Sequence, residues 1–389
     1  MSKYRAGQFM STISLAICLQ AQAEFEYKLT ILPLPEGLSD SLAMDVNDVG
    51  VVAGSMGTLS TYHHAAAWFD GEVVDLTGIG ISGATARGIN EFGTIVGMTD
   101  EFGINAYQWQ EGSLEQLVTP SSCCSEAWSI NNSGVICGNI PSAGTGSHHA
   151  ACIWIGGQWQ LLADVGGSAS VAYDINDQEE VVGVSSLGNG QSRGCTWIDG
   201  VPVELPVPEG FSGHVWSVSI NAHGTVVGYG NGRAMKWMGG EVQELMPISA
   251  EMPNYANDLN DDEIIVGHSY GESFEGSHAC RWIDGQVEDL NELVDRGEWR
   301  LYEAVAINSG GVIVGMAFSA QNERRAYCLE PIIPHCPEDL DEDGIVGVDD
   351  LLALLGSFGI GDDGDVDGDG DTDVNDVLLL LAAYGSACA

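Results

Sequence analysis

The chain has 389 residues, of which 52 are glycine, 56 are acidic and only 12 are lysine or arginine. With 44% hydrophobic residues, this composition is typical of a turn-rich β protein and not of a disordered chain. The formal net charge of −44 argues against binding to the phosphates of DNA or RNA. It indicates instead solubility, tolerance of salt, or divalent cations.

The segment 1–23 has the pattern of a secretory signal peptide. Lys3 and Arg5 provide a positive start, a short apolar stretch follows over residues 9–19, and Ala21-Gln22-Ala23 fits a cleavage site. We therefore expect a secreted protein, extracellular or at the cell surface, in a compartment that permits disulfides. No other run approaches the ~18 apolar residues of a membrane span.

A long repeat fills the middle of the chain. Each of seven copies has an asparagine with a glycine seven positions later, and a small residue four positions before it. The asparagines are Asn47, Asn90, Asn131, Asn176, Asn221, Asn260 and Asn308, and the small residue is alanine except at Ser217. Six copies continue with a tryptophan, followed by glycine three positions later and leucine eight positions later. These tryptophans are Trp68, Trp109, Trp154, Trp197, Trp237 and Trp282.

Each copy predicts four short antiparallel strands. The segment 47–50 is a tight-turn sequence that ends in glycine, and residues 50–54 form a short apolar strand ended by Gly54. Residues 65–68 form a third strand, and Asp70-Gly71 is a hairpin turn into a fourth. Four strands in every copy indicate propeller blades, which must stack because one blade cannot bury both faces of its sheet. Residues 24–331 are therefore predicted to form a mainly β, seven-bladed β-propeller; a linear β-solenoid is the alternative.

The N-terminal strand is predicted to close the ring. The seventh copy ends at Pro331 without the tryptophan or a fourth strand, whereas residues 27–32 form an extra strand before the first copy. Pairing of these two ends would complete the seventh blade and remove the exposed edges.

The copies resemble the HAF repeat of extracellular bacterial proteins. The matching motifs are Ile89-Asn90, Val96-Gly97, His64-Ala65 and His278-Ala279, with closing stretches at 290–294, 299–301 and 326–327. The resemblance covers roughly residues 27–331. It implies a secreted β-propeller-like domain but no settled activity.

Most distinctive residues of the repeat are expected to be structural. A catalytic group is normally used once, so recurring tryptophans indicate inter-blade core and recurring asparagines indicate turn caps. The pairs His63-His64 and His148-His149, with His278, could instead place imidazoles on one rim as metal ligands or sugar contacts. A local disulfide among Cys123, Cys124, Cys137 and Cys152 is a further possibility, whereas Cys152, Cys195 and Cys280 are expected to be small buried residues.

No catalytic constellation is evident, because G-x-S-x-G, H-E-x-x-H, C-x-x-C and phosphate-binding glycine loops are all missing from the sequence. The favoured function is therefore a non-enzymatic binding or scaffold protein. The alternative is a polysaccharide hydrolase or lyase with paired carboxylates in the propeller funnel.

Two acidic loops follow a linker at 332–337 and predict two calcium sites. Each has carboxylates at loop positions 1, 3, 5 and 12, glycine at 6 and a backbone carbonyl at 7, the pattern of an EF-hand loop. A leucine-rich segment expected to be helical follows each loop. The predicted ligands are Asp339, Asp341, Asp343, Ile345 and Asp350 in the first loop, and Asp365, Asp367, Asp369, Asp371 and Asp376 in the second.

Two loop-and-helix units with aspartate at position 12 and no entering helix resemble the type I dockerin. The resemblance covers roughly 338–385, within a predicted module at 338–389, and implies docking to a cohesin-like or cell-surface protein. The loops lie closer together than in clostridial dockerins, and Val348-Asp349 and Val374-Asn375 at positions 10 and 11 are not familiar cohesin-specifying pairs. We also expect Cys336 and Cys388 to form a disulfide that clamps this small module.

Overall fold

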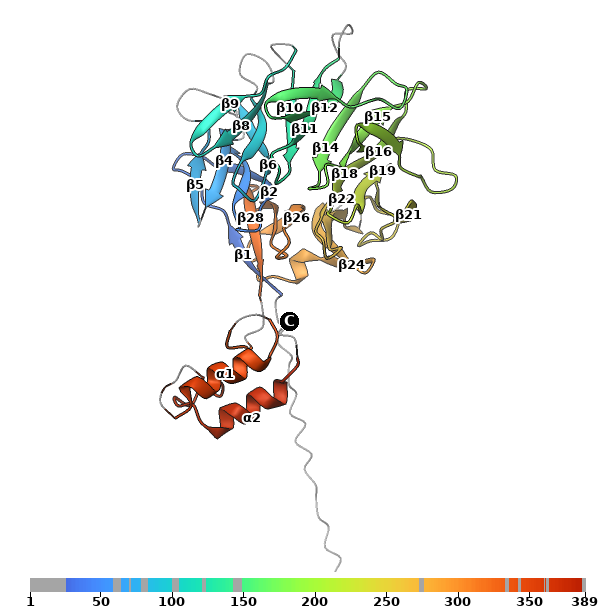
Figure 1. Cartoon of the computed structure of the whole chain (residues 1–389). Coiled ribbons are helices and arrows are strands. Elements are labelled where there is room, and N and C mark those ends of the chain that lie inside the picture. The colour runs from blue at the N-terminus through green and yellow to red at the C-terminus, as the bar shows by residue number, and fades with distance from the viewer. Residues whose placement is uncertain are drawn as a thin grey trace, which may run out of the picture.

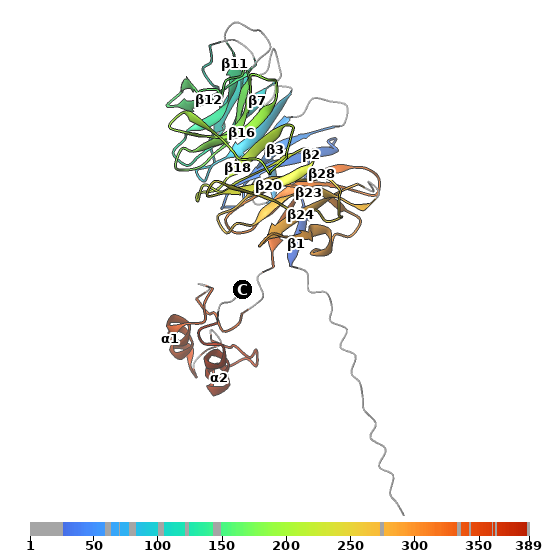
Figure 2. The ribbon, with the colours of Figure 1, turned by 90° about the vertical axis from the view of Figure 1, so that its right-hand side faces the viewer.

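The computed structural model describes residues 26–58, 64–69, 71–77, 83–99, 105–120, 124–142, 149–272, 276–332, 336–341, 344–359, 361 and 364–386. Over these residues the chain forms seven four-stranded antiparallel sheets, arranged as a ring, and two short α-helices. The helices lie apart from the sheets in both views (Figures 1 and 2). The prediction of a mainly β, seven-bladed propeller is confirmed.

Six blades use four consecutive strands each. Blade 1 comprises β2 (Asp40–Val46), β3 (Val52–Gly57), β4 (His64–Phe69) and β5 (Glu72–Asp75). Blade 2 comprises β6 (Ala84–Ile89), β7 (Ile95–Thr99), β8 (Asn105–Gln110) and β9 (Ser113–Gln116). Blade 3 comprises β10 (Glu126–Ile130), β11 (Ile136–Pro141), β12 (His149–Ile155) and β13 (Gln158–Leu161).

The next three blades repeat this order. Blade 4 comprises β14 (Ser170–Ile175), β15 (Val181–Ser186), β16 (Ser192–Ile198) and β17 (Val201–Glu204). Blade 5 comprises β18 (Val215–Ile220), β19 (Val226–Gly230), β20 (Arg233–Met238) and β21 (Glu241–Glu244). Blade 6 comprises β22 (Asn254–Leu259), β23 (Ile265–Tyr270), β24 (Ser277–Ile283) and β25 (Gln286–Asp289), followed by the 3₁₀ turn η2 (Leu290–Glu292).

Blade 7 is built from both ends of the propeller. Its strands are β26 (Arg300–Ile307), β27 (Ile313–Phe318), β28 (Arg324–Pro331) and the N-terminal β1 (Tyr27–Ile31). β1 pairs antiparallel with β28, with Leu29 opposite Leu329. The predicted closure by the N-terminal strand is therefore confirmed.

The tryptophans pack between blades, as expected. Five of the six repeat tryptophans are at most 2% exposed, and Trp109 is partly buried. In these five the indole Nε1 donates to the carbonyl after the leucine that ends the preceding blade. Trp68 donates to the Pro33 carbonyl at 2.9 Å, so Leu32 at the end of β1 holds the place of that leucine. The N-terminal segment thus supplies both the fourth strand of blade 7 and the carbonyl that bonds to the next tryptophan.

The seven asparagines form a closed ring of hydrogen bonds. Each side-chain Nδ2 donates to the backbone carbonyl of the asparagine in the next blade at 3.0–3.3 Å, and Asn308 donates to Asn47 to complete the circle. Each Oδ1 accepts the N–H four residues later at 2.8–3.0 Å. The expected turn cap is present, and the same side chain also joins adjacent blades.

The repeat glycine has a different role from the one its sequence suggests. Gly54 does not end a strand, since β3 continues to Gly57. It lies opposite a β-bulge in β2, between Ala43 and Asp45, and a Cβ on Gly54 would stand 2.0 Å from the Leu42 carbonyl oxygen. The other six glycines face the equivalent carbonyl at 2.0–2.1 Å. Glycine is required because the bulge pushes that carbonyl into the space of a side chain.

The C-terminal helices are α1 (Val348–Ser357) and α2 (Val374–Ala383), which confirms the two predicted helical segments. Their small core is centred on Val346, Leu354, Val366 and Leu380. Leu354 and Leu380 hold equivalent places in the two helices. No helix in the described part of the chain is long and apolar enough to cross a membrane.

Replacement of one ring asparagine should destabilise the propeller. In Asn131→Ala, the buried carbonyl of Asn176 and the N–H of Val135 lose their partners. We expect a loss of about 2 kcal/mol or more in the free energy of unfolding, because each unsatisfied buried group costs about 1–3 kcal/mol. Urea unfolding followed by tryptophan fluorescence measures this, with the exposed loop variant Asn189→Ala as the control. A loss no larger than that of the control would show that the ring contributes little.

Candidate functional site

The first repeat strand of each blade, called the inner strand below, is β2, β6, β10, β14, β18, β22 or β26. The bulged residue of each inner strand faces a cavity on the propeller axis. These seven residues each stand three positions before the repeat asparagine: Met44, Arg87, Trp128, Tyr173, Val218, Asn257 and Val305. The cavity, called the funnel below, has a volume of about 390 Å³ and is also lined by Tyr229 and Glu303. All seven inner strands therefore contribute a side chain to one site.

The bulge explains why two consecutive residues face the axis. Side chains on a regular strand alternate between faces, but every inner strand shifts register at this point. As a result, the residue after the bulge also lines the axis. This position borders both the funnel and a second axial cavity of about 250 Å³, which is also lined by repeat asparagines. The residues that border both cavities are Asp45, Ser129, Asp174, Ser219 and Asp258.

One wall of the funnel is aromatic and fixed in place. The Arg87 guanidinium lies over the Trp128 ring, 3.8 Å from its centroid, and Trp128 meets Tyr173 edge-to-face at 5.0 Å. The indole Nε1 of Trp128 donates to Asn139 Oδ1 at 3.1 Å. Burial lowers the pKa of Arg87 and raises that of Tyr173 to about 12. The contacts preorganise the wall, and the raised pKa keeps Tyr173 neutral near pH 7.

A ladder of half-buried aromatic rings leads from the funnel over blades 5 and 6. Tyr229, which lines the funnel, stacks on Trp216 at 5.5 Å and meets Tyr255 at 5.0 Å. Tyr255 in turn stacks on His268 at 4.7 Å. The ladder extends the aromatic surface away from the axis along two neighbouring blades.

The carboxylates on the axis hold adjacent blades together. Asp45 accepts the N–H of Ile89 at 2.8 Å, and Asp174 accepts that of Ile220 at 2.9 Å. Asp258 accepts the N–H of Ile307 at 2.8 Å. Each bond runs from one blade to another, so these groups bind the inner strands as well as lining the cavity.

Asp174 and Asp258 are joined through one hydroxyl. The Oγ of Ser219 lies 3.0 Å from Asp174 Oδ2 and 2.6 Å from Asp258 Oδ1. A hydroxyl has one hydrogen, so the second contact is a hydrogen bond only if a carboxyl is protonated. Asp174 also accepts from Ser129 and from two backbone N–H groups. Burial raises the pKa of Asp258 to about 7, so Asp258 is expected to keep its proton below that pH.

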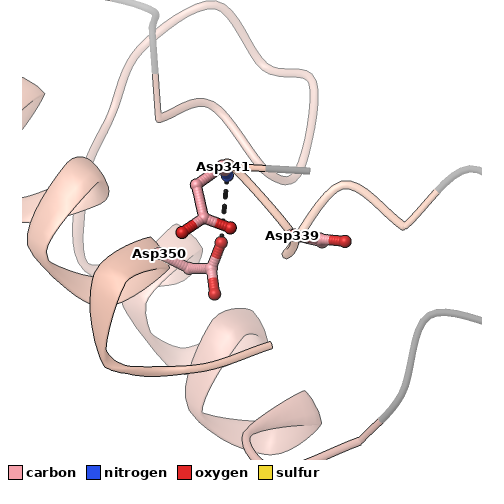
Figure 3. Close-up of side chains that lie close together, drawn as sticks. All are labelled: Asp339, Asp341 and Asp350. Carbon is pink, nitrogen blue, oxygen red and sulfur yellow. Dashed lines mark hydrogen bonds between the residues drawn. The ribbon is translucent and has the colours of Figure 1, made fainter. Parts of the chain in front are cut away.

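The C-terminal acidic loops bring together three of the predicted ligands each. Oxygens of Asp339, Asp341 and Asp350 lie within 4.8 Å of one another, as do those of the second-loop residues Asp365, Asp367 and Asp376. Figure 3 shows the carboxylates of Asp341 and Asp350 facing each other, with the Asp341 N–H donating to Asp350. The glycine at position 6 donates its N–H to the aspartate at position 1 in both loops, at 3.0 and 2.8 Å.

The position-12 aspartates are fixed by the backbone. Asp376 accepts the N–H groups of Asp373, Val366 and Asp367 at 2.6–3.1 Å. These bonds lower its pKa. At Asp350 burial raises the pKa, but the equivalent three bonds outweigh it and leave the value lowered. Both carboxylates are therefore held ionised at the start of their helices.

The remaining predicted ligands belong to the same two loops. Asp371 is crowded by Asp369, whose charge raises the pKa of Asp371, and Ile345 lies at position 7 of the first loop. Asp343 lies outside the described residues.

The three described histidines of this set each have a polar partner within their own blade. His64 Nδ1 lies 3.4 Å from Asp75, and His278 Nδ1 lies 2.6 Å from Asp289, in each case within one blade. His149 contacts Asn139 at 2.9 Å. Among the residues that the structure describes, the candidate metal groups contain no histidine; His63 and His148 lie outside them.

The cysteines of the propeller are mainly packing groups. Cys152, Cys195 and Cys280 are fully buried, as predicted from their place before the tryptophans. Cys137 and Cys152 are thiols not bonded to each other, which rules out that pairing of the proposed local disulfide. Cys123 lies outside the described residues.

No protein-family model matches this chain, and no curated protein matches it. Among solved structures, a streptogramin B lyase aligns with 10% identity over 80% of this chain and 100% of that one, with a TM-score of 0.49. The β-propeller domain of the trilobed protease from Pyrococcus furiosus aligns with 12% identity over 75% and 94%, with a TM-score of 0.48. YCF48 bound to D1 peptide aligns with 15% identity over 80% and 97%, with a TM-score of 0.49.

The funnel residues were not identified as a site from the sequence. Their signal was available, because the position three before each asparagine carries a different type of side chain in almost every copy while its neighbours recur. A bulge cannot be read from that pattern, so the variable position could not be assigned to the axis. The carboxylate-bearing position was obscured by the general acidity of the chain.

The proton on Asp258 should make stability fall with rising pH. Between its ordinary pKa of 3.8 and its folded value of about 7, the folded state keeps a proton that the unfolded state has lost, so raising the pH through this window destabilises the fold, by about 1.4 kcal/mol per pKa unit. Asp258→Asn keeps a donor toward Ser219 and an acceptor for Ile307. We expect its Tm to fall less than that of the wild type between pH 5 and 8.

Calorimetry across that pH range measures the difference, with Asp261→Asn, an exposed carboxylate of the same blade, as the control. Parallel Tm curves for Asp258→Asn and the wild type would contradict a proton on Asp258.

Proposed function

We propose that this chain is a secreted, non-enzymatic binding protein with two parts: a propeller of HAF-type repeats that binds an extracellular ligand, and a dockerin-like calcium module that docks it to a protein partner. The observation that carries the proposal is the duplicated module. The same acidic loop, followed by the same helix, occurs twice, beginning at Asp339 and again at Asp365.

The two loops fit calcium by the chemistry of their donors. Calcium takes oxygen ligands from carboxylates and backbone carbonyls, and each loop brings three carboxylates within 4.8 Å of one another. The carboxylate at position 5 and the backbone carbonyl at position 7 would add further oxygens in the second loop, where the charge of Asp369 raises the pKa of Asp371. A bound divalent cation would supply the positive charge that relieves this repulsion.

The helices offer matching apolar surfaces to a partner. Four large apolar or aromatic residues of α1 and its end are 41–60% exposed, and the equivalent residues of α2 and its end are 47–61% exposed. The pairs are Val348 and Val374, Leu352 and Leu378, Leu355 and Leu381, and Phe358 and Tyr384. Exposed apolar patches of this kind mark protein-interaction sites. A cohesin-like or cell-surface protein is therefore the proposed partner.

Two further features belong to this proposal. Secretion rests on the leader pattern at 1–23, which lies outside the described residues. The Cys336–Cys388 disulfide also stays a prediction, because Cys388 lies outside them, while Cys336 packs against the core of the module.

The alternative function, cleavage of a polysaccharide in the funnel, has one supporting observation: Asp174 and Asp258 share Ser219, and burial raises the pKa of Asp258 to about 7. Against it, both carboxylates accept backbone N–H groups of the next blade and so serve the scaffold. Release of reducing ends by the wild type that is lost in Asp174→Asn would favour the enzyme.

Calcium should order the C-terminal module selectively. In the full-length protein, we expect calcium to slow amide hydrogen exchange of α1 and α2 at least tenfold relative to EGTA, because the cation neutralises crowded carboxylates. Propeller peptides should not change. The double variant Asp339→Asn/Asp365→Asn should lose the effect, and Asp295→Asn, an exposed carboxylate of the propeller, should keep it. Equal exchange of α1 and α2 in calcium and EGTA would exclude calcium-dependent ordering.

The apolar helix faces should be needed for docking. A purified cohesin domain is the first probe, followed by surface proteins extracted from the cells that secrete the chain. We expect calcium-dependent capture by the full-length protein and at least a tenfold weaker association for Leu352→Ser/Leu378→Ser. Val201→Ser, which alters a residue 61% exposed on the propeller, is the control. Undiminished capture by the double variant would place docking elsewhere.

A further inference from the structure

We propose that the funnel is a binding site for a neutral saccharide, with Trp128 and Tyr173 as its apolar wall. Arg87, Asn257 and Glu303 provide its hydrogen-bonding groups. The inference rests on the proposed function of the propeller as a ligand-binding domain, and it names the site and the class of ligand.

The first argument is that the funnel positions take no part in the contacts that recur in every blade. The repeat asparagines, tryptophans and glycines recur because they join blades or accommodate the bulge. The bulged residue is the extra residue of its strand and has no register partner. Across seven copies it is aliphatic, aromatic, cationic or amide-bearing. A position on a rigid frame that carries unlike side chains around one cavity has the character of a recognition site.

The second argument is preorganisation of the aromatic wall. Trp128 is held on one face by Arg87 and at its Nε1 by Asn139. The amide of Asn139 is in turn 2.9 Å from His149. Such a chain fixes a ring before any ligand arrives, which reduces the ordering cost of binding. Aromatic rings cover the C–H faces of sugar rings well, because both surfaces are flat and weakly polar.

The third argument is the unsatisfied hydrogen-bonding capacity. The Nε of Arg87 is buried and has no hydrogen-bond partner, which is costly unless a ligand supplies one. On the opposite side, Asn257 donates to Glu303 at 2.9 Å and to the Ala304 carbonyl at 2.8 Å, so the Glu303 carboxylate is positioned as an acceptor. The funnel thus offers a donor and an acceptor across one cavity. Sugar hydroxyls can both donate and accept, and therefore fit both sides.

The charges select a neutral ligand. Asp174 and Glu303 border the funnel within a chain of net charge −44, so an anionic ligand meets repulsion. Arg87, stacked at the wall, disfavours a cation there.

The funnel volume of about 390 Å³ is at the lower end of small-ligand pockets and suits the end of a glycan. The aromatic ladder from Tyr229 to His268 provides a surface for the remaining sugar units of the glycan.

The test is affinity gel electrophoresis of the full-length protein in glucomannan, xylan, galactan and laminarin, with polygalacturonate as the anionic and chitosan as the cationic polysaccharide. We expect retardation by at least one neutral polysaccharide. Trp128→Ala and Arg87→Gln should each weaken the association at least tenfold. Phe92→Ala is the control, because Phe92 is 70% exposed in the turn on the asparagine side.

Near-UV circular dichroism and thermal unfolding establish that each variant is folded, and Trp128→Phe, which keeps an aromatic ring, should retain most of the binding. The inference is overturned if no neutral polysaccharide retards the wild type, if only a charged one does, or if Trp128→Ala and Arg87→Gln bind as the wild type does. Retardation unaffected by the funnel variants would leave propeller binding in place and refute this site alone. Loss of calcium-dependent ordering in the hydrogen-exchange assay would instead refute the proposed function of the module, whatever the funnel binds.

Discussion

The closed ring of asparagine hydrogen bonds is the interaction on which the propeller depends. A sheet of four short strands cannot bury both faces, so every blade needs two neighbours. The ring provides a geometrically defined bond at each of the seven junctions, and Asn308 to Asn47 joins the last copy to the first. The same side chain caps a turn through its Oδ1, so local and long-range structure are specified by one residue type. Farther from the axis, the tryptophans donate hydrogen bonds to the preceding blade, and β1 completes the sheet of blade 7.

A second constraint joins scaffold to site. The bulge in every inner strand displaces one carbonyl toward the neighbouring strand, and only glycine leaves room for it. The same displacement turns two successive residues to the axis. One of them, often aspartate or serine, bonds to another blade, and the other lines the funnel. The glycine that the sequence analysis placed at the end of a strand therefore marks the β-bulge, and the bulge creates the cavity.

Much of the fold was predictable because recurrence separates structural residues from the rest. Seven asparagines at regular spacing predicted seven blades, and the missing strand after Pro331 predicted closure by residues 27–32. The acidic loops were predictable for a different reason: a metal loop draws its ligands from one short segment, so its spacing is visible in sequence. The funnel draws one residue from each of seven distant segments. Its members, such as Arg87 and Trp128, share no local pattern, and only the ring brings them together.

The bulge also separates two properties that most binding proteins must satisfy with the same side chains. Because the bulged residue makes no ladder bond of its own, exchanging it alters the lining of the cavity and leaves the recurring asparagine and tryptophan bonds in place. Each blade therefore acts as an interchangeable carrier of one contact group. An array that grew by duplication would gain, with every new copy, all the residues that join adjacent blades. It would also gain one cavity-lining position whose side chain selection can vary.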